Sequence, residues 1–248
     1  MNSARYDCIG VGYSMYRVPD KRIARHIDLA LGDAHTVLNI GAGTGSYEPV
    51  DRAVVAVEPS TEMIRQRGPT AAVIIRASAA CLPFRTESFD AALAVLTIHH
   101  WSQRLRGLRE MQRVARHRIV VLTWDPDHAG FWLLQDYFPE ILEIDQAAFP
   151  PISEFRDILG LIDVQPILIP HDCSDGFLGA YWRRPNAYLD RGARQAISTF
   201  SKLSDVHSSL RRLENDLATG VWEQKYRRLL SLPELDVGYR LIIGRKAA

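Results

Sequence analysis

The chain has 248 residues, and 30 Lys and Arg against 29 Asp and Glu give a formal net charge of +1. This length fits one large domain or a domain with a substantial cap. A composition that is 47% hydrophobic and 24% charged, with 16 Gly and 13 Pro, excludes the disordered, collagen-like and coiled-coil classes. Because a near-neutral chain has no global field that attracts polyanions, we expect a small-molecule substrate, with no nucleic acid and no membrane as partner.

The cysteines and the N-terminus favour a reducing, cytoplasmic location. Cys8, Cys81 and Cys173 are odd in number and widely spaced, which favours neither a disulfide framework nor a zinc site, and we propose no metal. Residues 1–7 lack the apolar stretch of a secretory signal, and no segment approaches the roughly 18 apolar residues of a membrane span. The oligomeric state is left open.

The first predicted element is a helix over residues 21–31. Pro19 and Asp20 lead into it, and Gly32 ends it. Its apolar positions recur at helical spacing and form one stripe, made of Ile23, Ile27, Ala30 and Leu31. We expect this helix to flank the sheet that follows.

Five strands are predicted between Thr36 and Trp124, where short β-branched runs alternate with longer polar or amphipathic stretches. This alternation is typical of βαβ units in a parallel sheet. Most runs are apolar at consecutive positions, so we expect helices on both faces of a doubly wound α/β sheet. The runs are Val37–Ile40, Val54–Val57, Ala72–Ile75, Ala91–Ile98 and Ile119–Leu122.

Two connections between these strands carry predictions of their own. Only a short helix fits between Gly45 and Val54, a stretch that contains Pro49. Ser102 is expected to cap a longer helix, whose apolar side would pack on the sheet through Leu105, Leu108, Met111 and Val114.

The C-terminal part is predicted to add two strands and a cap. Val164–Ile169 and Tyr239–Ile243 have the pattern of strands, and Glu154–Leu159 that of a helix. Helical spacing fills the stretch between the two strands, and residues 171–175 resemble a turn with a helix cap. The predicted domains are a lid over 1–35, a core over 36–170 and 237–248, and cap insertions over 125–151 and 171–236.

The most informative stretch, Val37–Gly45, is a strand that runs straight into a GxGxG turn. Glycines at 41, 43 and 45 permit positive φ and let backbone N–H groups approach a ligand without interference from a Cβ atom. Such a turn predicts a nucleotide-like ligand, although it also occurs as a purely structural turn.

Glu58 ends the next apolar run, and Pro59 and Ser60 follow it at the expected start of a helix. A carboxylate at this strand end is placed to accept hydrogen bonds from both hydroxyls of a ribose. The alternative is that Glu58 only interacts favourably with the dipole of the helix that follows. The glycine turn beside it favours the ribose contact.

Four motifs, in order and at natural spacing, resemble class I S-adenosylmethionine-dependent methyltransferases, most closely the type 11 methyltransferase domain that acts on small molecules. The resemblance covers about residues 13–124 and implies a mostly parallel, seven-stranded, Rossmann-like sheet with a helical cap, and S-adenosyl-L-methionine as cofactor. The motifs are Leu38–Gly45, Val57–Ile64, the stretch from Ala77 through Leu82-Pro83-Phe84 to Ser88-Phe89-Asp90, and Leu96–Trp101.

The resemblance also implies which residues hold the cofactor. Two positions depart from the family: Asn39 stands where an acidic residue usually opens the loop, and Ser78 where Asp usually accepts the adenine amino group. Both keep a side-chain oxygen and remove a charge. The implied cofactor-binding residues are Tyr16, Arg17, Asn39, Gly41, Ala42, Gly43, Gly45, Glu58, Pro59, Met63, Ser78, Ala79, Leu96 and Thr97.

Two groups of aromatic and charged residues are open to two interpretations. Residues 13–17 either close over the cofactor, as the N-terminal lid of similar proteins does, or lie solvated on the surface. The aromatic residues of the cap, Phe131 and Trp132 among them, form either core or an apolar substrate chamber.

Catalytic residues are expected at the carboxyl edge of the sheet. In methyl transfer the enzyme mainly positions the nucleophile and excludes water, and a base is needed only when the nucleophile arrives protonated. His99 and His100 follow the fourth strand and are candidate bases, although either could pack beside Trp101 or cap the next helix. Asp125, after the fifth strand, either orients a histidine or belongs to a turn before Pro126.

The predicted function is transfer of a methyl group from S-adenosylmethionine to oxygen or nitrogen of a small metabolite. The alternatives are a cofactor-binding partner protein without turnover and an NAD-dependent oxidoreductase. Ser46 stands where the dinucleotide pattern GxGxxG needs its last glycine, which disfavours NAD. Glu58 and Glu48 are expected to give acidic surroundings that suit a sulfonium better than a diphosphate.

Overall fold

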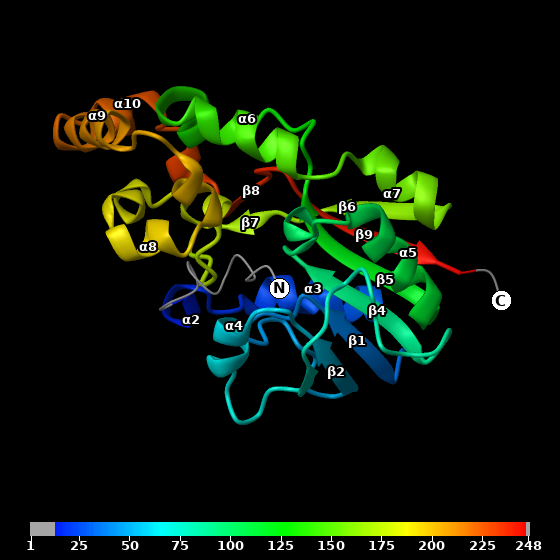
Figure 1. Ribbon diagram of the computed structural model, residues 1–248. Coiled ribbons are helices and arrows are strands. Elements are labelled where there is room, and N and C mark those ends of the chain that lie inside the picture. Colours follow the sequence, from blue (N-terminus) through cyan, green and yellow to red (C-terminus); the bar gives the residue numbers. More distant parts are fainter. Residues whose placement is uncertain (1–12, 247–248) are drawn as a thin grey trace.

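A seven-stranded sheet organises the computed structural model, which describes residues 13–246 (Figure 1). The strand order is β3-β2-β1-β4-β5-β9-β6, with β9 antiparallel to both of its neighbours and the pairs from β3 to β5 parallel. This confirms the predicted doubly wound, mostly parallel sheet. The strands are β1 Thr36–Ile40, β2 Ala53–Val57, β3 Val73–Ile75, β4 Phe89–Val95, β5 Ala115–Trp124, β6 Ile162–Pro166 and β9 Tyr239–Arg245.

Successive residues of each central strand are buried against different helices. In β1, Val37 packs in the cluster that contains helix α3 (Lys21–Leu31), whereas Leu38 packs in the cluster that contains α5 (Arg104–Val114) and α7 (Ile152–Leu159). Both side chains are fully buried. Because each face is covered, the strands need apolar residues at consecutive positions, as the sequence indicated.

Helix α3 forms where the sequence predicts it. The side chain of Asp20 accepts a hydrogen bond from the backbone N–H of Arg22 at 2.9 Å, and Gly32 ends the helix with a φ of 58°. The buried side of the helix is the predicted stripe of Ile23, Ile27, Ala30 and Leu31.

Helix α5 differs from the prediction at its start. Its N-cap is Gln103 instead of Ser102, and Leu105 is 48% exposed, because it lies on the helix away from the buried positions Gly107, Leu108, Met111 and Val114. A Cβ atom on Gly107 would lie 2.5 Å from a ring carbon of Trp101. The ring of Trp101 therefore needs the glycine beneath it.

The predicted short helix between β1 and β2 is not formed. Residues 41–52, all of them described, consist of turns and bends. Tyr47 in this stretch has a positive φ of 62° and is buried in the core, so the connection follows the packing of that ring instead of a helical path.

The predicted strand over 164–169 is divided between two sheets. Residues up to Pro166 belong to β6, whereas β7 (Ile169–Pro170) pairs with β8 (Glu234–Leu235) in a separate two-stranded sheet. Proline has no backbone N–H to donate to a ladder, which explains the short β7.

Short helices gather beyond one end of the main sheet (Figure 1). Trp132 lies at their centre, with ring centroids 5.8, 5.7 and 5.2 Å from those of Tyr137, Tyr188 and Trp222, so its ring belongs to a core. Helix α2 (Tyr13–Tyr16) and α4 (Thr61–Arg65) lie below this group. The helices that gather beyond the end of the sheet are η2 (Leu133–Tyr137), α6 (Pro139–Ala148), η3 (Leu178–Tyr181), η4 (Pro185–Leu189), α8 (Arg191–Gln195), η5 (Ser198–Lys202), α9 (His207–Ala218), α10 (Val221–Lys225) and η6 (Leu229–Ser231).

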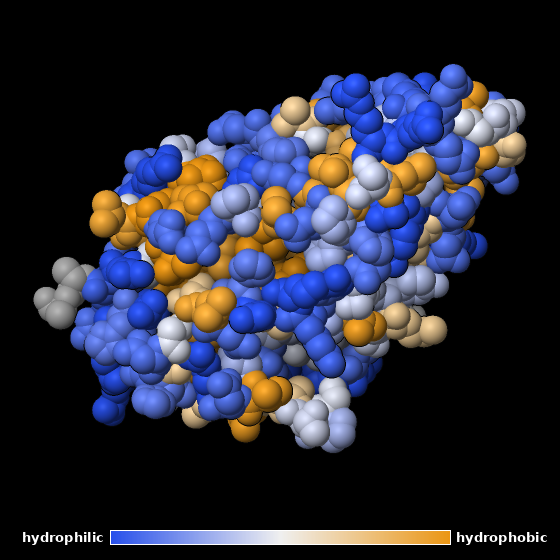
Figure 2. Space-filling view, turned by 180° about the vertical axis from the view of Figure 1, so that it is seen from behind, coloured by the Kyte–Doolittle hydropathy of each residue, from blue (hydrophilic) through white to orange (hydrophobic). Residues whose placement is uncertain are grey.

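Hydrophilic side chains cover most of the face seen from behind, and hydrophobic ones form one larger area left of centre and smaller areas elsewhere (Figure 2). Within residues 13–246, no helix combines the length and apolar character needed to cross a membrane. The same part of the chain contains no group of three or more His, Cys, Asp or Glu suited to a metal ion. Cys8, the start of the predicted lid and the last two residues of the predicted core lie outside the described residues.

Replacing Asp20 by Ala is expected to destabilise the fold by about 2 kcal/mol at pH 7, because it removes the N-cap of α3 and the hydrogen bond from Ser174 N at 3.1 Å. The Arg22 guanidinium holds the pKa of Asp20 well below its usual range. This contribution is therefore complete above about pH 4 and is lost as the pH falls further. Chemical denaturation at pH 7 and pH 3 checks this.

The Asp33→Ala variant serves as the control, because the side chain of Asp33 is 93% exposed. Equal stability of the two variants at pH 7 would contradict the assignment of Asp20.

Candidate active site

A cavity of about 430 Å³ opens where the carboxyl ends of β1 and β4 diverge, and we call it the main cavity. Strand order reverses between these two strands, and ligands of doubly wound sheets bind at such a point. Thirteen of the sequence-predicted site residues line it: Arg17, Asn39, Gly41, Ala42, Gly43, Glu58, Pro59, Met63, Ser78, Ala79, Leu96, Thr97 and His100.

The glycine turn brings bare backbone against the ends of two neighbouring strands. The N–H groups of Gly41 and Ala42 donate to Val57 O at 2.8 and 3.0 Å, at the end of β2. A Cβ atom on Gly41 would lie 2.1 Å from Oγ1 of Thr97, which follows β4, and Gly41 has a φ of 69°. Glycine is therefore required here both by space and by conformation.

The carboxylate of Glu58 lies directly beside this turn. It is 6% exposed and accepts hydrogen bonds from Gly43 N and Ser60 N, each at 2.9 Å. Ser60 in turn caps α4 by accepting from Met63 N at 3.2 Å. These contacts fix a carboxylate in the cavity wall at the end of β2, where a ribose would meet it.

A buried ion pair behind the turn explains why residue 39 is an asparagine instead of the acidic residue expected from the family pattern. Its Nδ2 donates to Oε1 of Glu48 at 3.2 Å, and Glu48 pairs with Arg67 at 2.8 Å, both side chains being under a tenth exposed. An aspartate at position 39 would place two carboxylates together, so an amide donor suits this environment. Glu48 lines no part of the main cavity, which corrects the expectation that it gives the cofactor acidic surroundings.

Three segments meet at the buried carboxylate of Asp175. Arg17, which precedes α3, pairs with it, and the hydroxyl of Tyr47 in the β1–β2 connection donates to it at 2.9 Å. Asp175 is 1% exposed and lies beyond β7 in the chain. Burial is the main cause that raises the pKa of Tyr47 well above its ordinary value, which keeps its hydroxyl a donor. The sequence predicted only a turn at 171–175, because nothing in it shows that Arg17 and Tyr47 lie nearby.

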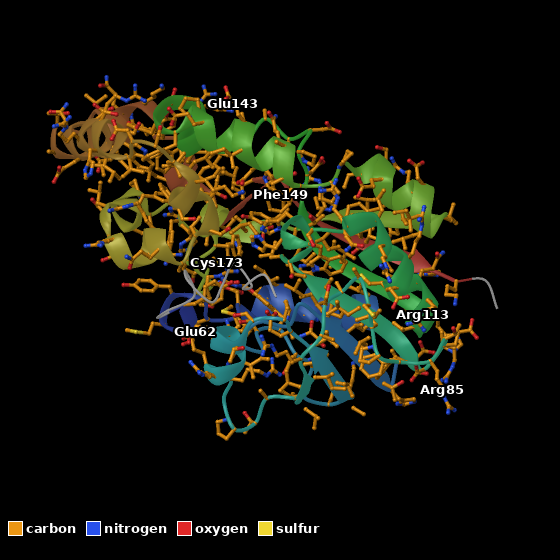
Figure 3. All side chains as sticks on the ribbon, in the orientation of Figure 1. Glu62, Arg85, Arg113, Glu143, Phe149 and Cys173 are labelled. Carbon is orange, nitrogen blue, oxygen red and sulfur yellow. The ribbon has the colours of Figure 1, made fainter. Side chains whose placement is uncertain are left out.

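A second cavity, of about 50 Å³, adjoins the main one through Arg17 and Leu96, which line both. We call it the inner chamber. His100 lines the main cavity and His99 the inner chamber, and their ring centroids are 3.8 Å apart. The His99 ring also stacks on Phe149, which lies where α6 meets the sheet (Figure 3). The inner chamber is also lined by Trp124, Asp145, Phe177, Thr199 and Tyr239.

Leu96 has a φ of 50°, which is unusual for a residue with a branched side chain. Its backbone N–H donates to Leu122 O at 2.8 Å, so the end of β5 holds the strained turn in place. Strain of this kind gathers at functional sites, and here it lies between the two cavities.

Three predicted site residues lie outside both cavities. Tyr16 packs its hydroxyl against Gly192 and has a raised pKa caused mainly by a hydrogen bond with Asp190. Gly45 faces the Glu48–Arg67 pair. Asp125 lies 3.5 Å from Arg240 and accepts from Asp127 N at 3.1 Å, as the turn alternative expected.

Sequence reasoning missed several residues that line the main cavity. The motifs contain Ser60 and Trp101 but give no sign of which way their side chains face. Tyr47 and Arg76 lie in connections without a periodic pattern, and Arg76 reaches the site by donating to Pro59 O at 3.2 Å. The glycine spacing of the GxGxG loop and the apolar runs give no information about these side chains.

The chain is similar to known proteins over most of its length. One solved structure, described as a "putative methyltransferase from antibiotic biosynthesis pathway" of Anabaena variabilis, is 36% identical, with a TM-score of 0.85 and 92% of this chain and 98% of that one covered. A family model for the methyltransferase domain matches residues 38–121. The chain belongs to the class I S-adenosylmethionine-dependent methyltransferases. The resemblance that the motifs indicated is confirmed.

Two further relatives of this methyltransferase match over shorter stretches. The human "probable tRNA methyltransferase 9B" is 40% identical over 98 residues, which are 36% of this chain and 21% of that protein. A ubiquinone/menaquinone biosynthesis C-methyltransferase of Geotalea uraniireducens is 29% identical over 144 residues, which are 53% of this chain and 60% of that protein. The match thus spans about a fifth of the tRNA methyltransferase relative.

The main cavity of this methyltransferase fits the cofactor of its family. A volume of about 430 Å³ lies in the usual range for small-molecule sites. The turn at Gly41 presents backbone that a Cβ atom would block, and Glu58 offers a buried carboxylate to the ribose. Ser78 also lines the cavity, with its Oγ accepting from Ala80 N at 3.2 Å. These residues suit a nucleoside with an amino-acid tail.

The Gly41→Ala variant is expected to bind S-adenosylhomocysteine at least about tenfold more weakly. The added methyl group would clash with Thr97, and the alanine would have to adopt a positive φ that is strained for any residue with a Cβ atom. Calorimetric titration measures the affinity. Gly68→Ala is the matched control, since no atom lies within 4 Å of the added Cβ. Equal affinities in the two variants would mean that the turn does not approach the ligand.

Proposed function

We propose that this methyltransferase transfers a methyl group from S-adenosylmethionine to oxygen or nitrogen of a small-molecule metabolite. The observation that carries the proposal is the pair of adjoining cavities. The main cavity contains the glycine turn and Glu58, and the inner chamber lies next to it under the helices that follow β5 and β7. In this proposal residues 125–151 and 171–236 are the substrate cap, and residues up to 35 are the lid.

The residues of the main cavity would hold the cofactor in three places. Glu58 would accept hydrogen bonds from the ribose hydroxyls, the turn at 41–43 would contact the amino-acid tail, and Ser78 with Ala79 would border the adenine. Arg17, already fixed by Asp175, would approach the tail from the lid. When bound, S-adenosylmethionine supplies an electrophilic methyl group. The remaining task of the protein is to orient the acceptor and exclude water.

His100 and His99 are the candidate bases. They lie on the short 3₁₀ turn η1 (Ile98–His100) directly after β4, one on each cavity, so an acceptor held between the cavities would meet an imidazole. An imidazole there is suited to take a proton from a hydroxyl or an ammonium nitrogen near neutral pH. The stacking of His99 on Phe149 limits the orientations of its ring.

A small molecule is favoured over a nucleic acid as substrate. The formal net charge of +1 gives no general attraction to a polyanion, and the inner chamber measures only about 50 Å³. The similarity to a tRNA methyltransferase covers 36% of the chain and 21% of that protein, so most of the chain is outside it. A cytoplasmic location is proposed because the three widely spaced cysteines do not favour a disulfide framework.

The protein is expected to bind S-adenosylmethionine and S-adenosylhomocysteine in calorimetric titrations and to give no saturable signal with NADH. Glu58→Gln should lower the affinity for the cofactor by about tenfold, because a charge-assisted hydrogen bond to the ribose becomes a neutral one. Glu62→Gln on α4 is the control, since Glu62 lines neither cavity. Absence of binding at millimolar cofactor would refute the enzyme proposal.

Transfer of a tritiated methyl group from the cofactor should be detected with a panel of small amines and phenols, and not with bulk tRNA. If His100 is the base, His100→Asn should lower kcat by about a hundredfold and leave the KM for the cofactor within about twofold. His26→Asn, an exposed residue of α3, is the control. Turnover that is unchanged by both His99→Asn and His100→Asn would exclude both histidines as bases, and labelling of tRNA alone would contradict the small-molecule proposal.

A further inference from the structure

The inner chamber contains a buried carboxylate. Asp145, on α6, is 5% exposed, and its Oδ1 accepts a hydrogen bond from the hydroxyl of Thr199 at 2.7 Å. Within residues 13–246 no lysine or arginine forms an ion pair with it. A buried carboxylate with one neutral donor is unusual, because buried charges are ordinarily paired.

This carboxylate opposes folding at neutral pH. Burial raises the pKa of Asp145 to about 6, although the nearby charge of Lys202 and the hydrogen bond from Thr199 act to lower it. Because the native state holds the proton more tightly than the unfolded chain, stability falls as the pH rises from about 4 to 6. A buried carboxylate whose ionised form weakens the fold is a candidate for a functional contact, and the geometry of the chamber around it decides which contact it can make.

Aromatic rings line the chamber beside aliphatic side chains such as Leu178 and Ile197, and each ring is held in place. The indole N–H of Trp124 donates to Val237 O at 3.0 Å, and the hydroxyl of Tyr239 accepts from Gly179 N at 3.3 Å. Phe177 lies 4.6 Å from the Tyr239 ring, and Phe149 lies 5.7 Å from Trp124, both measured between centroids. Rigid rings of this kind attract a cation to their faces.

The other charges at the chamber do not suit an anion. Arg17 reaches the chamber wall, but its guanidinium is paired with the buried carboxylate of Asp175. The negative charge of Asp145 also acts on Tyr239, whose hydroxyl pKa is raised mainly by burial and further by this carboxylate. A carboxylate ligand would meet this charge at close range, whereas a neutral apolar ligand would leave it unpaired.

We propose that the inner chamber binds a cationic nitrogen of the substrate, held by the carboxylate of Asp145 and by the faces of the surrounding aromatic rings. The substrate class of the proposed methyltransferase is then a small molecule that carries an amine, and this inference depends on the function proposed above. The inner chamber has a volume of about 50 Å³. This is enough for about three to five groups the size of a water molecule, which matches a methylammonium or trimethylammonium headgroup. Asp145 is the residue that sets this specificity.

The test uses headgroup probes and an isosteric variant. Tetramethylammonium, tert-butanol and acetate are titrated by saturation-transfer NMR and calorimetry into the protein saturated with S-adenosylhomocysteine. The wild-type chain should bind the cation and should bind acetate at least about tenfold more weakly. Asp145→Asn keeps an oxygen that accepts the hydrogen bond from the Thr199 hydroxyl. This variant should bind tetramethylammonium about tenfold more weakly than the wild type, while its affinity for tert-butanol should change less than about twofold.

The matched control is Asp216→Asn. Asp216 also accepts a single hydrogen bond from a hydroxyl, that of Tyr137 at 2.8 Å, but it lines neither cavity, so this variant should bind the cation as the wild type does. Thermal unfolding at pH 7 should show Asp145→Asn to be as stable as the wild type or more stable, because it removes a buried charge.

The outcomes separate this inference from the proposed function. Equal binding of tetramethylammonium to the wild type and to Asp145→Asn, no binding of it at all, or preference for acetate would overturn the inference while cofactor binding stands. Failure of S-adenosylhomocysteine to bind would overturn the proposed function instead, and the cation is then titrated into the protein alone, where the same comparison of variants decides the role of Asp145.

Discussion

The site depends on the close approach of bare backbone at Gly41 to the ends of two strands. The turn hydrogen-bonds Val57 at the end of β2, and it leaves no room for a side chain opposite Thr97 at the end of β4. This contact places Glu58 beside the N–H of Gly43, so the carboxylate and the turn face one cavity. A bulkier residue would push the turn away from both strands and from Glu58.

A second level of organisation joins segments that are distant in sequence. Asp175 is reached by Arg17 from the N-terminal side and by Tyr47 from the β1–β2 connection. Removing one partner of such a buried group leaves the others unsatisfied, so the arrangement specifies one relative position of the three segments. The same arrangement holds Arg17 at the boundary of the two cavities, where cofactor and acceptor would meet.

One departure from the family pattern, Asn39, follows from local electrostatics. Asn39 faces Glu48, which already carries the negative charge at that position and pairs with Arg67. The arginine also donates to Gly43 O at 3.2 Å, so the ion pair supports the turn from behind. The negative charge beside position 39 is thus carried by Glu48, which does not line the main cavity.

The sequence by itself determined the doubly wound sheet, the glycine turn, Glu58 and the histidine pair after β4, because these depend on local periodicity and on turn chemistry within a few residues. Helix α3 was predictable for the same reason, since its cap and its stripe are local. Only the tertiary structure decided that Tyr16 faces α8, that Asp175 pairs with Arg17, and that Asp145 closes a chamber beside His99. Those contacts join segments far apart in the chain, and no local pattern encodes which distant side chain will be buried against which.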